Sequence, residues 1–489
     1  MAIHMSMPEQ KSAAASAGGA AARRLGQVAF AATLALLALA AVPYGSVEPW
    51  WSAAVQCGLF ALGALWVIEG WLTGGWRVEA GSLAAPICGL ALLAYMQALP
   101  LRGGATGGGA DVLWRTVSAD PAESGRVAVK LLALVVAGQV LLRYANSRRR
   151  LRALAYAVIA VGAASACFAV ARLAAQGEAR GFVLPLLGPG AGFGQFINKN
   201  HFALLMEMAL GPALGLIFGG AVRRPRLPLA GALALIIGVA LVLSNSRGGI
   251  FGMLCQMLFV AAMSMLTTGR RAAVAGAPHE RGAGRGVKPR LALAALAAAA
   301  VPLLVGTVAW VGNDPVASNL GLAASDFTAQ GGDININRRD MWLAAWRSFA
   351  AHPALGSGLG GFWLDVTEHH DAPGTYVPRQ AHNDYLELLA GGGVVGGALG
   401  AWFIYAFVRR ARSVWRGADR ERRALSLGGA AGLVAVAAHA ALDFGLHVTA
   451  NSLVCVALVV LAVARVKADD TPRGRRRRRR SPDVPGEAG

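Results

Sequence analysis

The sequence contains few charged residues. Asp, Glu, Lys and Arg together make up 15% of the 489 residues, whereas hydrophobic residues make up 55%. A soluble domain carries about a quarter of its residues as charges. The apolar residues also come in runs of about twenty, which is the length of a helix that crosses a bilayer. These properties argue against an ordinary soluble enzyme and predict an all-α, polytopic integral membrane protein.

Cysteine and the common catalytic motifs are also scarce or missing. All five cysteines lie inside apolar runs, without the spacing of a metal site or of a disulfide framework. No G-x-S-x-G, H-E-x-x-H or Walker motif occurs, so the hydrolase, zinc-protease and ATPase classes have no support. One G-x-G-x-x-G match, Gly356–Gly361, lacks a βαβ context, and we interpret it as a glycine-rich bend packed against a helix at 338–350. We predict no metal and no cofactor.

Twelve apolar runs are long enough to span a membrane. The first follows Arg23 and Arg24, as a cleaved signal peptide would, but the many later spans favour an uncleaved helix. The transmembrane domain is predicted to cover 25–466. The predicted spans are 25–42, 51–72, 82–99, 127–142, 151–173, 202–220, 227–243, 249–266, 291–310, 383–408, 425–444 and 449–466.

Acidic residues are few beside basic ones: 26 Asp and Glu against 46 Lys and Arg give a net charge of +20. Nucleic-acid binding is disfavoured, because the basic residues lie in short connectors between spans and so form an orientation signal. If the N-terminus is inside and the spans alternate, the inside segments hold 34 of the 46 basic residues. Both termini are therefore predicted to be cytoplasmic: a disordered tail at 1–24 and a polybasic tail at 467–489 that contacts anionic membrane lipids.

The longest polar insert, about 311–382, lies between the ninth and tenth spans and is predicted to face outside. It is long enough to contain short helices of its own. Asn337 and Asp340 have nearly the spacing of a capping box, and apolar residues then recur at helical intervals. We predict an amphipathic helix at 338–350 that ends before Pro353.

Three arginines are candidates for binding an anion. Arg247 follows an apolar span directly, in the turn SNSRGG, where an arginine is costly unless it is paired or lines a polar cavity. The alternative is an arginine that snorkels to the interface. Arg338 and Arg339 begin the predicted loop helix, where a bound phosphate would offset their unfavourable interaction with the helix dipole. The alternative is an exposed basic pair.

Other polar residues lie at the predicted outer ends of spans or inside them. His382 is a candidate general base, with Asp384 or another acid to hold its tautomer. His439 and Asp443 lie one turn apart, so they either take part in the site or join helices as a polar pair. Glu207 is an intramembrane carboxylate that needs a partner. The candidates for substrate binding, besides Arg339, are Lys199, Asn200, Arg379, Asn383, Asp384 and Tyr385.

The order of these motifs resembles the O-antigen ligase and O-antigen polymerase superfamily of bacterial envelope glycosyltransferases. The resemblance covers about 190–450 and rests on SRGG, NRRDMW, HPALGSGLGGF, HNDYLELL and HAALDFGLH. It implies a glycan donor on undecaprenyl diphosphate and an acceptor that is lipid A core or another lipid-linked glycan. It also implies inverting, metal-independent chemistry at the periplasmic face of the bacterial inner membrane.

The resemblance also implies roles for single residues. Arg247 and Arg338 would hold the diphosphate and stabilise its charge as it leaves, and His382 would activate the acceptor hydroxyl. Since the arginine is doubled here, Arg338 and Arg339 both remain candidates. One departure is Gly391, a position where the family often has an acidic residue.

Three other functions are compatible with parts of the sequence. A polymerase would share the ligase chemistry and differ in the acceptor. A lipid-glycan flippase would place its polar residues near the middle of the bilayer, whereas the arginines and His382 here lie at the outer ends. A receptor-like scaffold would leave Arg247 at a span end unexplained.

Overall fold

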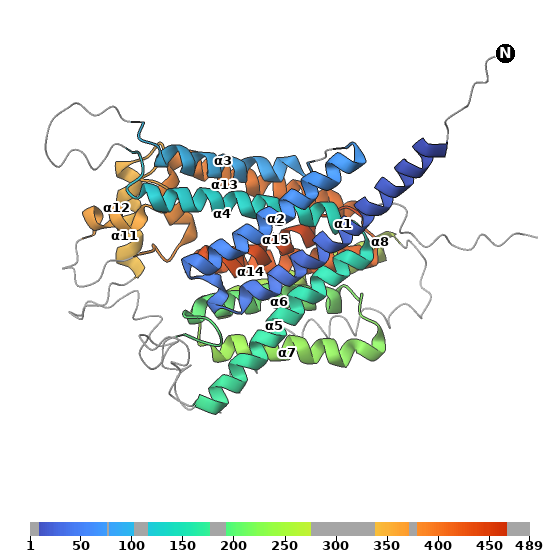
Figure 1. The fold of residues 1–489 in the computed structure, drawn as a ribbon. Helices are drawn as coiled ribbons and strands as arrows, with labels where there is room; N and C mark the ends of the chain where they lie inside the picture. The colour runs from blue at the N-terminus through green and yellow to red at the C-terminus, as the bar shows by residue number, and fades with distance from the viewer. Residues whose placement is uncertain are drawn as a thin grey trace, which may run out of the picture.

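The computed structural model describes residues 9–75, 78–101, 116–176, 192–274, 338–370 and 379–466 (Figure 1). Within them, the regular elements are helices, with one isolated bridge between Phe193 and Phe196. The elements are α1 (Glu9–Ala41), η1 (Tyr44–Ser46), α2 (Pro49–Thr73), α3 (Gly81–Ala98), α4 (Pro121–Tyr144), α5 (Arg148–Gln176), α6 (Lys199–Phe218), η3 (Arg224–Arg226), α7 (Leu227–Leu243), α8 (Arg247–Val274), α11 (Arg338–Ala351), α12 (Phe362–His369), α13 (Asp384–Gly417), α14 (Arg420–Ala440), η5 (Gly445–His447) and α15 (Thr449–Val463).

The predicted polytopic helical fold is confirmed. In the described part of the chain, ten helices are long and apolar enough to cross a membrane, and α15 is a shorter apolar helix. The predicted ninth span, 291–310, lies outside the described residues. Several predicted spans extend a few residues past their helices, most of all the eleventh, which was predicted to run to 444, whereas α14 ends at Ala440. The chain then turns, which releases Asp443 from the helix.

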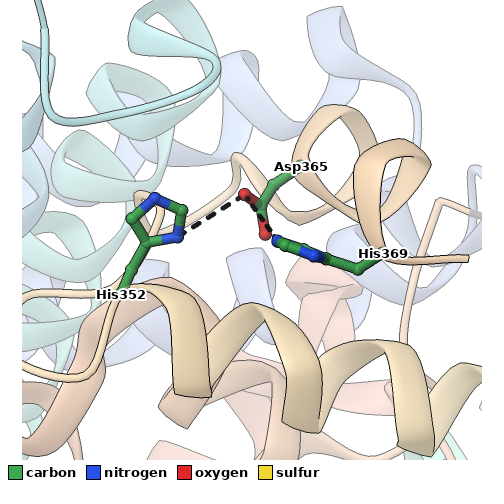
Figure 2. Close-up of side chains that lie close together, drawn as sticks. All are labelled: His352, Asp365 and His369. Carbon is green, nitrogen blue, oxygen red and sulfur yellow. Dashed lines mark ion pairs between the residues drawn. The ribbon is translucent and has the colours of Figure 1, made fainter.

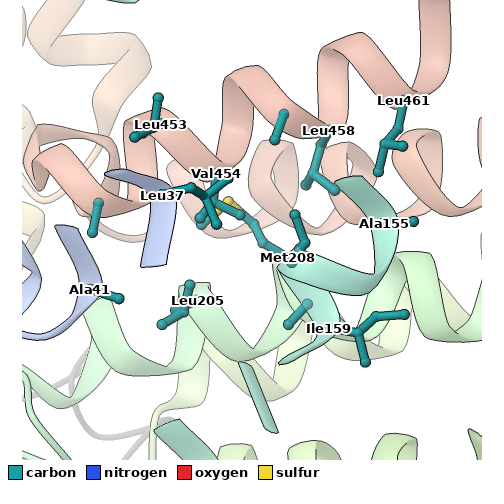
Figure 3. Close-up of a cluster of buried hydrophobic side chains, with 14 of the residues drawn as sticks. Leu37, Ala41, Ala155, Ile159, Leu205, Met208, Leu453, Val454, Leu458 and Leu461 are labelled. Carbon is teal, nitrogen blue, oxygen red and sulfur yellow. The ribbon is translucent and has the colours of Figure 1, made fainter. Parts of the chain in front are cut away.

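The centre of the bundle is formed by α6 and α15. The apolar window of α6 is 89% buried, and most side chains of α15 are buried as well. Figure 3 shows α15 side chains packed between α1, α5 and α6, with labelled residues Leu37, Ala41, Ala155, Ile159, Leu205, Met208, Leu453, Val454, Leu458 and Leu461. Lipid is as apolar as these side chains, so close packing rather than removal from water stabilises such a centre.

Helices α6 and α14 cross in close contact because both present glycine. A Cβ added at Gly215 would lie 2.3 Å from the Cα of Gly428, and one added at Gly211 would lie 2.8 Å from the Cα of Gly432. Within each helix the two glycines are four residues apart, which is the small-residue pattern that lets membrane helices approach closely. The crossing fixes α14, whose C-terminal end carries His439.

Gly215→Ala is therefore expected to destabilise the protein by about 1–3 kcal/mol, the usual cost of overpacking. The matched control is Gly231→Ala in α7, where nothing lies within 4 Å of an added Cβ. That control should be neutral or stabilising, because alanine removes the conformational cost of glycine in a helix. Thermal unfolding in detergent measures both, and equal midpoints for the two variants would contradict this packing.

Charged residues of the connectors pair at the end of the bundle opposite α11 and α12. Arg143 lies 3.0 Å from Glu69, and Arg148 and Arg152 pair with Asp419 and Glu421. The turn before α8, the turn after α14 and the helices α11 and α12 gather at the other end, on the left in Figure 1. The bundle thus has one end rich in basic connectors and one end that carries the candidate site.

The amphipathic helix predicted at 338–350 is confirmed as α11. Its buried face is formed by Met341, Ala344, Ala345 and Ser348. The proposed N-cap, Asn337, lies outside the described residues.

The glycine-rich bend at Gly356–Gly361 was predicted to pack against this helix. Gly356 donates from its N–H to the carbonyl of His352, just after α11, at 2.9 Å, and Cβ atoms added at the bend's glycines would also meet α13 and the segment 118–127. Gly358 donates from its backbone N–H to the Gly391 carbonyl at 3.0 Å. At Gly393, α13 is kinked with φ +60°, and this kink presents the carbonyls that the bend binds. The bend therefore has a structural role.

Candidate functional site

His382 lies immediately before α13 and is held by a buried acid. Its Nδ1 lies 3.0 Å from Oδ1 of Asp443, which follows α14. The His382 side chain is 37% exposed, whereas that of Asp443 is 1% exposed. His382 also has φ +50°, a left-handed conformation that costs a non-glycine residue free energy. An accessible imidazole is thus held in a strained position by a carboxylate that lies 61 residues further along the chain.

The backbone on both sides of His382 is fixed by side chains of α13. Asn383 caps this helix, since its Oδ1 accepts from the N–H groups of Tyr385 at 3.0 Å and Leu386 at 3.1 Å. On the other side, Oε2 of Glu387 accepts from the Ala381 N–H at 2.9 Å. These bonds determine where the His382 ring can point.

Asp443 determines which nitrogen of His382 is basic. Burial alone would raise the pKa of the Asp443 carboxyl, but the hydrogen bond with His382 and the nearby imidazoles of His439 and His201 hold that pKa below its ordinary range. An ionised carboxylate accepts, so Nδ1 of His382 donates and Nε2 is left as the basic nitrogen. The sequence predicted that Asp384 or another acid holds the tautomer of His382, and in the structure this acid is Asp443. Asp384 lies 3.5 Å from His447 Nε2 instead.

A second pair of polar residues extends inward from Asp443. His439 Nε2 lies 3.8 Å from Asp443 Oδ2, and His439 Nδ1 lies 3.0 Å from Glu207 Oε1. The side chains of His439 and Glu207 are 0% exposed. The prediction that Glu207 needs a partner is confirmed. Glu207 and His439 join α6 to α14 next to Asp443. Either side chain alone would be costly to bury within the membrane, and their pairing reduces this cost.

Helix α8 approaches this pair through glycine. A Cβ added at Gly248 would lie 3.3 Å from His439 Nε2, and one added at Gly252 would lie 2.7 Å from Glu207 Oε1. Ser246 caps the helix, because its Oγ accepts from the Gly249 N–H at 3.1 Å. Arg247, half-buried, is the first residue of α8 and precedes the glycine that contacts His439. The fold thus brings Arg247 to the cluster that holds His382.

The polar segment before α6 belongs to the same end. Ser246 donates from Oγ to Oδ1 of Asn200 at 2.8 Å, which joins the start of α6 to the turn before α8. The rings of His201 and His382 both meet the ring of Phe444 edge-on, with centroids 4.9 Å and 4.8 Å away. Phe444 therefore sets the spacing between the two histidines.

The other candidates differ in their placement. Arg338 and Arg339 are the first two residues of α11, and the structure describes only their position in this helix. Lys199 is exposed at the start of α6, and Arg379 is exposed before His382. Tyr385 donates from its hydroxyl to the Ala437 carbonyl at 2.9 Å, which links α13 to α14.

Two features of the site were missed. The sequence did not single out Glu387, although its position one turn into α13 is the signal of a side chain that can reach back to the preceding backbone. The meaning of Gly391 was also missed. A Cβ there would lie 2.9 Å from the Gly358 carbonyl oxygen, so the bend occupies the space of any larger side chain.

Part of the chain matches a known protein family. A family model described as O-antigen ligase matches residues 232–401, a range that includes Arg247, Arg338 and His382. Asp443, His439 and Glu207 lie outside the matched range. No curated protein matches the chain. Members of the matched family are membrane ligases and polymerases of the glycosyltransferase kind, so the chain is an enzyme of this general kind. Residues 232–401 of this multi-pass membrane protein therefore match an O-antigen ligase domain, which supports its membership of the O-antigen ligase superfamily.

Proposed function

We propose that the protein is a ligase that moves a glycan from undecaprenyl diphosphate to an acceptor hydroxyl, such as one on lipid A core. The observation that carries this proposal is the exposed His382 held by the buried Asp443, inside an O-antigen ligase domain. Reaction takes place at the periplasmic face of the bacterial inner membrane, with both termini in the cytoplasm. The basic connectors at the opposite end of the bundle support this orientation.

In the proposed reaction, Nε2 of His382 takes the proton from the acceptor hydroxyl. The resulting oxygen attacks the anomeric carbon of the donor sugar from the side opposite the diphosphate. The bond from that carbon to the phosphate oxygen breaks as the new glycosidic bond forms, so the configuration inverts. Asp443 stabilises the imidazolium that forms at His382, as an acid behind a histidine base does in acyl-transfer enzymes.

The leaving diphosphate carries developing negative charge, which must be stabilised by cations. Arg247 supplies one guanidinium, and Arg338 or Arg339 at the start of α11 supplies another. Guanidinium groups bind phosphate oxygens through two parallel hydrogen bonds, which orients the diphosphate as well as neutralising it. With these charges the step needs no metal ion.

The remaining candidates would bind the two sugars and the carrier. Exposed Lys199 and Arg379 flank the site and can contact phosphate or sugar, and Asn200 is placed beside the turn of Arg247. Asn383 and Tyr385 instead hold the start of α13, since their oxygens make helix contacts, and Asp384 lies 3.5 Å from His447 Nε2.

Reconstitution tests the proposal. Purified protein in liposomes should transfer a defined glycan from undecaprenyl diphosphate to lipid A core. A matched donor with a single phosphate should react at least about tenfold more slowly, because it loses one or more charge-assisted hydrogen bonds.

Three other results would change the assignment. Transfer only to a second lipid-linked glycan would identify a polymerase of the same superfamily. Movement of the donor across the bilayer without a new glycosidic bond would identify a transporter. Equal rates with both donors would contradict the proposed binding of the diphosphate.

A further inference from the structure

Three side chains, two from α12 and one from the end of α11, converge on one point (Figure 2). Asp365 and His369 lie one turn apart on α12, so they share a face, and His352 follows the end of α11. His352 Nδ1 and His369 Nε2 each lie 3.8 Å from Oδ1 of Asp365. All three atoms lie within 4.8 Å of one another.

The carboxylate at the centre of this cluster is buried and oriented. The Asp365 side chain is 5% exposed, and its second oxygen, Oδ2, accepts a hydrogen bond from the buried Ser348 Oγ. Oδ1 is thereby turned toward the two imidazoles. Within the residues that the structure describes, Nε2 of His369 is buried and has no hydrogen-bond partner. A buried nitrogen in this state needs a ligand, an ion or water.

We propose that His352, Asp365 and His369 bind a zinc ion, with water in the fourth position. Two imidazole nitrogens and one carboxylate oxygen form a ligand set that zinc prefers. In a tetrahedral zinc site the ligand atoms lie roughly 3.3 Å apart, so the present separations need only small side-chain rotations. His352 is 44% exposed, which allows its ring to move and gives an ion access from solvent. Ser348 holds the ligating carboxylate, as outer partners do in known metal sites.

The bound ion would fix the C-terminal end of α11 to α12. Since α11 begins with Arg338 and Arg339, the ion would hold in place the helix that carries these arginines. The three ligands are positioning residues and take no part in glycan transfer. The inference rests on the cluster alone. Zinc binding can therefore be absent while the proposed glycan transfer holds, and zinc can bind even if the proposed transfer is wrong.

The test measures zinc on the full-length protein, purified in detergent with a tag that contains no histidine. After treatment with a chelator, the protein is incubated with zinc chloride, desalted and analysed for metal. The wild type should retain one zinc ion per chain. His352→Ala, Asp365→Asn and His369→Ala should each lose stoichiometric binding. The matched controls Glu368→Gln and His370→Gln, on and next to α12, should retain it.

A second variant separates a metal site from a chance cluster of histidines. Ser348→Ala leaves all three ligands in place and should weaken zinc affinity by about 10–100-fold. Cobalt in place of zinc should give the visible spectrum of a four-coordinate site, which the three ligand variants should lose. Zinc retention below one ion per ten chains in the wild type would overturn the proposal. Equal retention by the wild type and the ligand variants would do the same, and the cluster would then be a set of His–Asp ion pairs.

Discussion

Asp443→Asn is expected to lower glycan transfer by about 10³–10⁴-fold, by analogy with removal of the acid behind a catalytic histidine. An amide is nearly the same size as the carboxylate, so the buried position is still filled. However, the amide carries no negative charge and can present an N–H to Nδ1 of His382. The ring would then take the other tautomer, and Nε2 would hold a proton instead of accepting one.

The rate should be measured with saturating donor on protein that elutes normally in detergent, so that loss of folding is separated from loss of chemistry. The matched control is Asp384→Asn, in an acid that the structure places beside His447 rather than His382. It should change the rate by less than about tenfold, because it has no contact with the proposed base. If Asp384→Asn were the more damaging change, Asp443 would not be the residue that orients His382.

Arg247→Ala is expected to lower transfer by about 10²–10³-fold, the usual effect of removing one donor to a developing negative charge. The reason is the position of Arg247 at the start of α8, next to the glycine that contacts His439. Arg247→Lys should recover only part of the rate, because an ammonium group keeps the charge but cannot form the paired hydrogen bonds of a guanidinium.

The matched control for this variant is Arg379→Ala, in an exposed arginine close to His382 along the chain. Its effect should be small and should appear in KM rather than in kcat, because an exposed cation attracts the anionic donor without stabilising the leaving group. A defect in Arg247→Ala that disappears at high donor concentration would mean that Arg247 only binds the donor.

The spans could be predicted from the sequence because bilayer thickness sets their length. Each predicted span within the described part of the chain coincides with one helix, apart from a few residues at its ends. Helix α11 was predicted from its repeat of apolar residues, and the partner of Glu207 was anticipated because a lone buried carboxylate is costly. The glycines after Arg247 were expected to allow close approach, and a Cβ added at Gly248 would lie 3.3 Å from His439 Nε2.

Contacts between distant segments could not be predicted in the same way. The pairing of His382 with Asp443 depends on how α13 packs against α14 and on the end of α14 at Ala440, which hydrophobicity alone extends to 444. The contact of the glycine-rich bend with α13 was not predicted, because the kink at Gly393 arises from one left-handed residue inside a long helix. The cluster of His352, Asp365 and His369 was missed because its ligands come from two helices joined by an irregular segment.

The central claim is that His382 is the base and that Asp443 acts through it. The most direct test compares transfer rates of His382→Ala, Asp443→Asn and the variant with both changes. If the two residues act as one unit, the double variant should be no slower than His382→Ala alone. Multiplication of the two defects in the double variant, or a wild-type rate in His382→Ala, would contradict the account.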